Sequence, residues 1–227
     1  MELPEYWMSR PAYQIEPSTQ VAFDHLLATA QADGVGPFIE YTLAAPKWQF
    51  LCYVAEHKCI ALHGSGNPGI AVFEPRQPVD LNEFGSQKAV YAAADGIWAM
   101  FFAIVDRERH SMILNNACIG LADASGQTSE PFYLFSIGQA ALSRRPWREG
   151  VVYLLPRDTF VEQPPIPFGQ FEVLAAQLAS QVPVTPLARL EVDPEDFPFL
   201  AQIRGHDDAR FQEYATAMQT GAPWPDD

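Results

Sequence analysis

The chain has 227 residues, of which 48% are hydrophobic and 19% charged, so it can bury a substantial core and is not typical of a disordered protein. Its 28 acidic side chains outnumber the 14 basic ones and give a formal net charge of -14. Proteins that bind a nucleic-acid backbone neutralise its phosphates with Lys and Arg, so the excess of acidic side chains disfavours nucleic acid as a partner.

The apolar runs, the N-terminal residues and the spacing of Cys and His argue against a membrane protein, a secreted protein and a metal-binding protein. No apolar run reaches the length of a membrane span, and the N-terminus MELPEYWMSRP lacks the basic start and apolar stretch of a signal peptide. We therefore expect a cytoplasmic protein with no membrane contact. Cys52, Cys59 and Cys118 lie among apolar neighbours, which favours small core residues. The five histidines show no HxxxH or HxH spacing, so we expect no metal.

The first 56 residues predict an irregular arm followed by two helices. Residues 1–16 hold prolines and aromatic residues without periodicity, whereas 17–32 carries apolar residues at helical spacing. Residues 46–56 predict a second amphipathic helix. We expect residues 1–56 to pack on a core formed by residues 57–227, the two parts making one compact unit.

The rest of the chain predicts mostly short strands. The almost wholly apolar segment 96–106 (GIWAMFFAIVD) interrupts them and predicts a helix that is buried on most sides. Residues 170–181 predict a short helix that runs into a strand, and 211–218 predict a terminal helix. Two helices followed by many strands indicate an α+β fold. The predicted strands are 58–65, 71–73, 89–93, 112–121, 131–137, 151–155 and 187–192.

Two short motifs stand out because the common catalytic signatures GxSxG and GxxxxGK[ST] are missing from the sequence, and the glycine-rich run GSGNPG (64–69) is not followed by the Lys of a phosphate loop. One is LHGSG (62–66) at the end of a predicted strand, and the other is FGSQKAVYAAAD (84–95), which leads into a strand and a buried helix. Together they resemble the ADP-ribosyltransferase superfamily, in particular the His-Tyr-Glu branch that includes the poly(ADP-ribose) polymerases. The resemblance covers residues 58–192 and implies an ADP-ribosyltransferase-like split β-sheet core with N-terminal helices.

The third element of that branch is a glutamate that opens a later strand. The window AAQLASQVPVTPLARLEV (175–192) is similar to the corresponding segment of some bacterial relatives, and it puts Gln177 where the glutamate is expected. A glutamine keeps a hydrogen bond to the ribose 2′-hydroxyl but lacks the charge. Three interpretations follow: slow or altered transfer, entry of another carboxylate (Glu162 or Glu172), or binding without turnover.

The resemblance implies that the chain binds NAD as a substrate and transfers ADP-ribose to a protein or small-molecule acceptor, with release of nicotinamide. His63 would hydrogen-bond ribose hydroxyls, while Gly64 and Ser65 would meet the nicotinamide carboxamide. Tyr91 would stack on the nicotinamide ring. Gln177 would occupy the catalytic position, where a carboxylate stabilises the positive charge that develops on the ribose.

Other interpretations compete with this one. A non-catalytic module that binds NAD or ADP-ribose fits the missing glutamate, and an RNA 2′-phosphotransferase shares the superfamily fold but conflicts with the net charge. The chain can also be an interaction scaffold in which the matches are coincidental, since a histidine at a strand end commonly bonds a backbone carbonyl. Helical spacing favours core packing for Trp98, Phe101 and Phe102.

Overall fold

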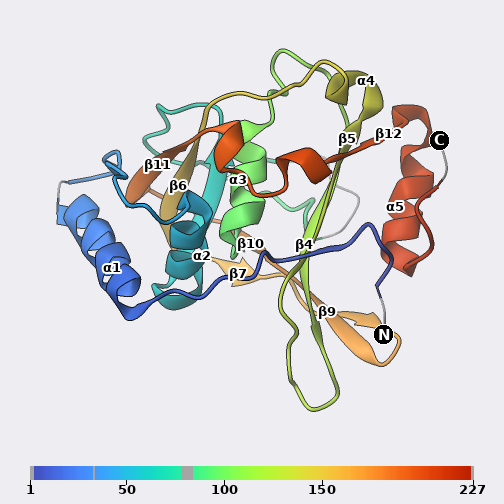
Figure 1. The fold of residues 1–227 in the computed structure, drawn as a ribbon, viewed down its shortest axis with the longest axis horizontal. Helices are drawn as coiled ribbons and strands as arrows, with labels where there is room; N and C mark the ends of the chain where they lie inside the picture. The colour runs from blue at the N-terminus through green and yellow to red at the C-terminus, as the bar shows by residue number, and fades with distance from the viewer. Residues whose placement is uncertain (1–2, 33, 78–83, 226–227) are drawn as a thin grey trace.

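Two six-stranded β-sheets form the framework of the chain (Figure 1). The computed structural model describes residues 3–32, 34–77 and 84–225. In the first sheet, which we call the motif sheet, every neighbouring pair of strands is antiparallel. In spatial order its strands are β11 (Ala188–Val192), β6 (Gly150–Pro156), β2 (Ile60–Ser65), β3 (Val90–Ala93), β10 (Gln177–Ser180) and β7 (Val161–Glu162).

The second sheet is built around β5 and contains the N-terminal arm. Five of its strands follow the order β1, β5, β4, β9 and then β8 in antiparallel pairs, while β12 runs parallel to β5. The strands are β1 (Met8–Ser9), β4 (Leu114–Ala122), β5 (Phe132–Gly138), β8 (Ile166–Phe168), β9 (Phe171–Ala175) and β12 (Arg204–His206).

The segment from β9 to β10 joins the two sheets. β9 pairs with β4 in the second sheet, and β10 pairs with β3 in the motif sheet. Between them, Ala176 donates its backbone N–H to Cys118 O at 2.9 Å and accepts from Ala94 N at 2.8 Å. A single residue is thus hydrogen-bonded to both sheets, which fixes the sheets relative to each other at this point.

Two helices, α2 (Lys47–His57) and α3 (Gly96–Ile104), pack in the main core between strands of both sheets (Figure 1). Asp95 caps α3 because its Oδ1 accepts from the backbone N–H of Trp98 at 2.8 Å. Every residue of α3 except Phe102 is buried, which confirms the prediction of a helix buried on most sides. The other helices are α1 (Pro17–Ala32), α4 (Gln139–Leu142), α5 (Phe211–Thr220) and the 3-10 turns η1 (Pro194–Asp196), η2 (Leu200–Gln202) and η3 (Asp208–Arg210).

Both faces of the motif sheet are covered, which explains why its central strands are continuous apolar runs. Leu62 and Leu154 belong to the main core with α2 and α3. Ala61 and Leu155, their neighbours in the chain, belong to a smaller cluster on the opposite face. Side chains of α1 and α2, including Phe23 and Phe50, share the main core with the sheet residues.

The predicted α+β class is confirmed, and the four long helices and most predicted strands form close to the expected positions. Segment 170–181 was wrongly predicted to begin as a helix, because it forms the two strands β9 and β10. Residues 71–73 form no regular strand, only an isolated bridge from Phe73 to Val184. Cys59 is exposed, contrary to the prediction of a core residue, whereas Cys52 and Cys118 are buried.

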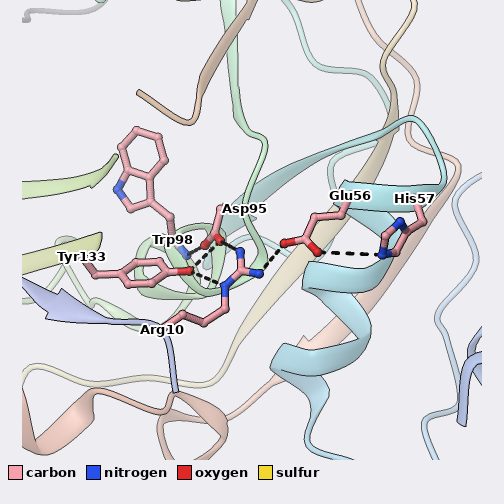
Figure 2. Close-up of polar contacts among 6 residues, drawn as sticks. All are labelled: Arg10, Glu56, His57, Asp95, Trp98 and Tyr133. Carbon is pink, nitrogen blue, oxygen red and sulfur yellow. Dashed lines mark hydrogen bonds and ion pairs between the residues drawn. The ribbon is translucent and has the colours of Figure 1, made fainter. Parts of the chain in front are cut away.

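A buried ion pair anchors the N-terminal arm to the core (Figure 2). Arg10 donates Nη2 to Asp95 Oδ2 at 2.9 Å and Nε to the Tyr133 hydroxyl at 3.1 Å, and it also pairs with Glu56. The Tyr133 hydroxyl in turn donates to Asp95 Oδ2 at 2.7 Å. The side chains of Arg10 and Asp95 are only 9% and 3% exposed, so the arm is held by charges that water barely reaches.

Candidate functional site

The three strands that carry the sequence motifs are immediate neighbours in the motif sheet. β2 contains His63, β3 contains Tyr91, and β10 begins at Gln177, so the prediction that this glutamine opens a strand is confirmed. Leu62, Ala93 and Gln177 lie in one row across these strands. Segments more than 80 residues apart in sequence are therefore brought together, as shown by the pairing of Gln177 with Ala93.

His63 bridges β2 and β3 next to that row. Its Nδ1 lies 2.7 Å from the backbone oxygen of Tyr91. Because a carbonyl oxygen can only accept, Nδ1 carries the proton, and in the neutral ring Nε2 is an acceptor. The ring also contacts Phe73, with 4.7 Å between ring centroids. Burial lowers the pKa of His63 below its ordinary value, which favours this neutral form.

The lowered pKa of His63 predicts a loss of stability in mild acid. In the unfolded chain His63 takes up a proton near pH 6.5, more readily than in the folded state, so the stabilisation present above that pH is lost as the pH falls. We expect the free energy of unfolding, measured with urea, to fall between about pH 7.5 and about pH 5.5.

His63→Asn, which keeps a donor for the Tyr91 carbonyl but does not titrate, is expected to reduce this fall. His206 has a pKa lowered by burial too and remains in both proteins, so the difference between them isolates His63. Equal slopes would contradict the prediction.

Gly64 and Ser65 have structural partners of their own. A Cβ on Gly64 would lie 1.9 Å from Ala99 O and 2.7 Å from Ala103 N, so the missing side chain lets α3 approach β2. Ser65 Oγ accepts from the backbone N–H of Asn67 at 3.1 Å. The close approach of a helix is enough to explain the glycine.

Tyr91 and Gln177 share one face of the motif sheet, and His63 lies on the other. Gln177 is opposite Ala93 and Ala179 is opposite Tyr91, whereas His63 is opposite Tyr153 in the smaller cluster. The Tyr91 hydroxyl lies 2.8 Å from the backbone oxygens of Phe84 and Gln87, where it fixes the loop that leads into β3. The structure thus links His63 to Tyr91 through the backbone rather than through facing side chains.

A cavity of about 850 Å³ opens beside Gln177, at the place where the two sheets meet. Trp98 and Phe102 of α3 and Asn116 of β4 line it together with Gln177, while His63 and Tyr91 are not among its described lining residues. Trp98 donates Nε1 to Asn116 Oδ1 at 2.6 Å, which ties α3 to β4 across the cavity wall. Gln177 is therefore the sequence-predicted site residue that reaches this space.

The prediction that the aromatic residues of this helix are core residues is confirmed for Trp98 and Phe101, which belong to the main core. Phe102 is half-buried and packs against that core, and both Trp98 and Phe102 line the cavity. Positions 98 and 102 are four residues apart and share one helix face, so the spacing marks them as a pair. The spacing alone does not say whether that face meets protein or open space.

Neither alternative carboxylate reaches the Gln177 side chain. Glu162 lies opposite Leu178 and so points to the other face of the sheet, where it pairs with Arg157. Glu172 is exposed on β9 in the second sheet, opposite Ala122. Among the described lining residues of the cavity there is no Asp or Glu. The entry of another carboxylate thus has no support in this arrangement.

Comparison with protein-family models, with curated proteins and with solved structures finds no match for this chain. Within the described ranges, no group of three or more His, Cys, Asp or Glu side chains is placed to hold a metal ion. Over the same ranges, no helix has both the length and the apolar character needed to cross a membrane. The interpretation of the site therefore depends on its own geometry and chemistry.

Proposed function

We propose that the chain is an ADP-ribosyltransferase-like protein that binds NAD and transfers ADP-ribose to an acceptor, releasing nicotinamide. The observation that carries the proposal is the adjacency of β2, β3 and β10, which bear the HGS, VYA and Gln177 segments. Among the described residues, the ladder between β2 and β3 consists of the pair Leu62–Ala93. NAD would run over the point where this ladder ends, from His63 on one side to Gln177 on the other.

The protonation of His63 is suited to a ribose. With Nδ1 donating to the Tyr91 carbonyl, Nε2 can accept a hydrogen bond from a ribose hydroxyl. Gln177, at the start of β10, can hydrogen-bond the 2′-hydroxyl of the other ribose. It cannot supply the negative charge that stabilises an oxocarbenium-like transition state, so transfer by this protein would be slow.

A second candidate is a module that binds NAD or ADP-ribose without turnover. The observation that favours it is the lack of Asp and Glu among the described residues that line the cavity beside Gln177. Without a carboxylate near the ribose, binding energy is not converted into stabilisation of the developing charge.

The test is an NAD titration by calorimetry, followed by an assay of nicotinamide release. We expect saturable binding at millimolar NAD, and Gln177→Glu is expected to raise nicotinamide release by about 10²-fold because it restores the charge. Gln181→Glu, an exposed position just after β10, makes the same change outside the cavity and is the matched control. Binding without release in the wild type would favour the second candidate. No binding at millimolar NAD would refute both.

A further inference from the structure

The cavity beside Gln177 is much larger than the space one amide side chain needs. Its volume of about 850 Å³ falls in the range of small-molecule sites, roughly 300–1,000 Å³. Its walls come from distant parts of the chain: β4 and β9 of the second sheet, α3, α5 and the N-terminal arm. Aromatic rings stand on three of these parts, namely Trp7 on the arm, Trp98 and Phe102 on α3, and Phe211 on α5.

The charge of the cavity differs from that of the whole protein. The chain carries 28 acidic residues, yet the described lining contains no Asp, Glu, Lys or His, and Arg107 is its one charged residue. The polar side chains of the lining are the amides Asn115, Asn116, Gln163, Gln177 and Gln219. A charged ligand would have to give up its water here with almost no opposite charge to replace it, which is costly. The lining therefore suits an uncharged, mainly apolar molecule.

One buried amide in the lining lacks a partner. Asn115 on β4 is 4% exposed, and its Nδ2 has no hydrogen-bond partner among the described residues. An unpaired buried donor costs roughly 1–3 kcal/mol. The Nδ2 atom itself is enclosed by protein, so a ligand in the cavity reaches it only after the Asn115 side chain turns toward the cavity. The neighbouring Asn116 already accepts from Trp98 Nε1, and the side chains of Gln163, Gln177 and Gln219 are further amide groups along the lining.

We propose that this cavity binds an uncharged aromatic small molecule that carries a hydroxyl, and that this molecule is the acceptor in the proposed transfer; the acceptor role rests on the proposed function. The hydroxyl oxygen would form a bond to C1 of the ribose as the bond from C1 to the nicotinamide nitrogen breaks. The bonding electrons leave with nicotinamide, which becomes neutral, and the hydroxyl proton passes to water.

The binding part is tested by calorimetry at pH 7 with two probes of the same ring, 2-naphthol and 2-naphthoate. A phenol ionises near pH 10 and a carboxylic acid near pH 4, so only the second probe is charged. We expect 2-naphthoate to bind at least about tenfold more weakly than 2-naphthol, a difference of about 1.4 kcal/mol. Ala117→Phe, which fills the cavity from β4, is expected to weaken 2-naphthol to a similar extent. Ala124→Phe, on an exposed turn, is the control and should leave binding unchanged.

Three results would each overturn the cavity proposal, whether or not NAD binds. They are absence of 2-naphthol binding, equal affinities for the two probes, and no effect of Ala117→Phe. The acceptor role is tested separately by mass spectrometry of the Gln177→Glu protein with NAD and 2-naphthol. A conjugate of ADP-ribose and naphthol supports it. Release of nicotinamide without the conjugate overturns the acceptor role alone. If nicotinamide is not released at all, the proposed function and the acceptor role fail together, and the calorimetry still decides whether the cavity binds the probe.

Discussion

Replacing Arg10 with alanine is expected to lower the free energy of unfolding by about 3–5 kcal/mol. The Arg10 guanidinium lies between two carboxylates, Asp95 and Glu56, and also donates to the Tyr133 hydroxyl (Figure 2). Removing it leaves Asp95, 3% exposed, without its cation in the interior. Because Asp95 also caps α3, a change that disturbs this carboxylate reaches the helix that packs against both sheets.

Urea unfolding monitored by circular dichroism measures this effect. Arg144→Ala, an exposed arginine, is the control and should change the free energy of unfolding by less than about 0.5 kcal/mol.

The ion pair of Arg10 and Asp95 is tested further with the variants Arg10→Met and Asp95→Asn. The double variant should lose clearly less stability than the sum of the two single changes, because neither partner is then left charged and alone. Additive losses would show that the two side chains act independently.

The contrast between α3 and segment 170–181 shows what local sequence can and cannot predict. α3 is apolar on every side and has an aspartate at its N-cap, so its type and start follow from neighbouring residues. Segment 170–181 contains the helix-forming run Leu174, Ala175, Ala176, yet it forms strands. Its long-range partners are β4 and β3, whose pairing residues lie 50 or more positions earlier, and the nearby strands β8 and β7 pair along its other edges. Tertiary pairing overrides the weak local preference.

The candidate site shows the same difference between what local sequence predicts and what depends on distant parts of the chain. The motifs predicted strands bearing His63 and Tyr91 and a strand that opens at Gln177, and these strands are neighbours in the structure. The sequence did not predict that His63 and Gln177 would lie on opposite faces, because that depends on the register of β2, β3 and β10. The cavity was missed as well. Its lining comes from segments as distant as Trp7 and Phe211, and no local pattern connects them.

Replacing Gly64 distinguishes a structural role of this glycine from a role in binding a ligand. Gly64→Ala is expected to lower the free energy of unfolding by about 3 kcal/mol, because the added Cβ would lie 1.9 Å from Ala99 O and only backbone movement can relieve the contact. Alanine in a strand is otherwise preferred over glycine by about 0.5–1 kcal/mol, so the predicted loss runs against the local preference.

Gly69→Ala is the matched control for this prediction. It lies in the loop after β2, and its added Cβ would come no closer than 3.4 Å to Asn67 Oδ1, so urea unfolding should show a change of less than about 1 kcal/mol. The same two variants are then titrated with NAD. If Gly64→Ala is as stable as the wild type but no longer binds NAD, the glycine serves the approach of a ligand and the packing explanation is wrong. If it is destabilised as expected, the HG pair of the motif is required by the contact between α3 and β2, and the assignment of a binding site depends on His63 and Gln177 alone.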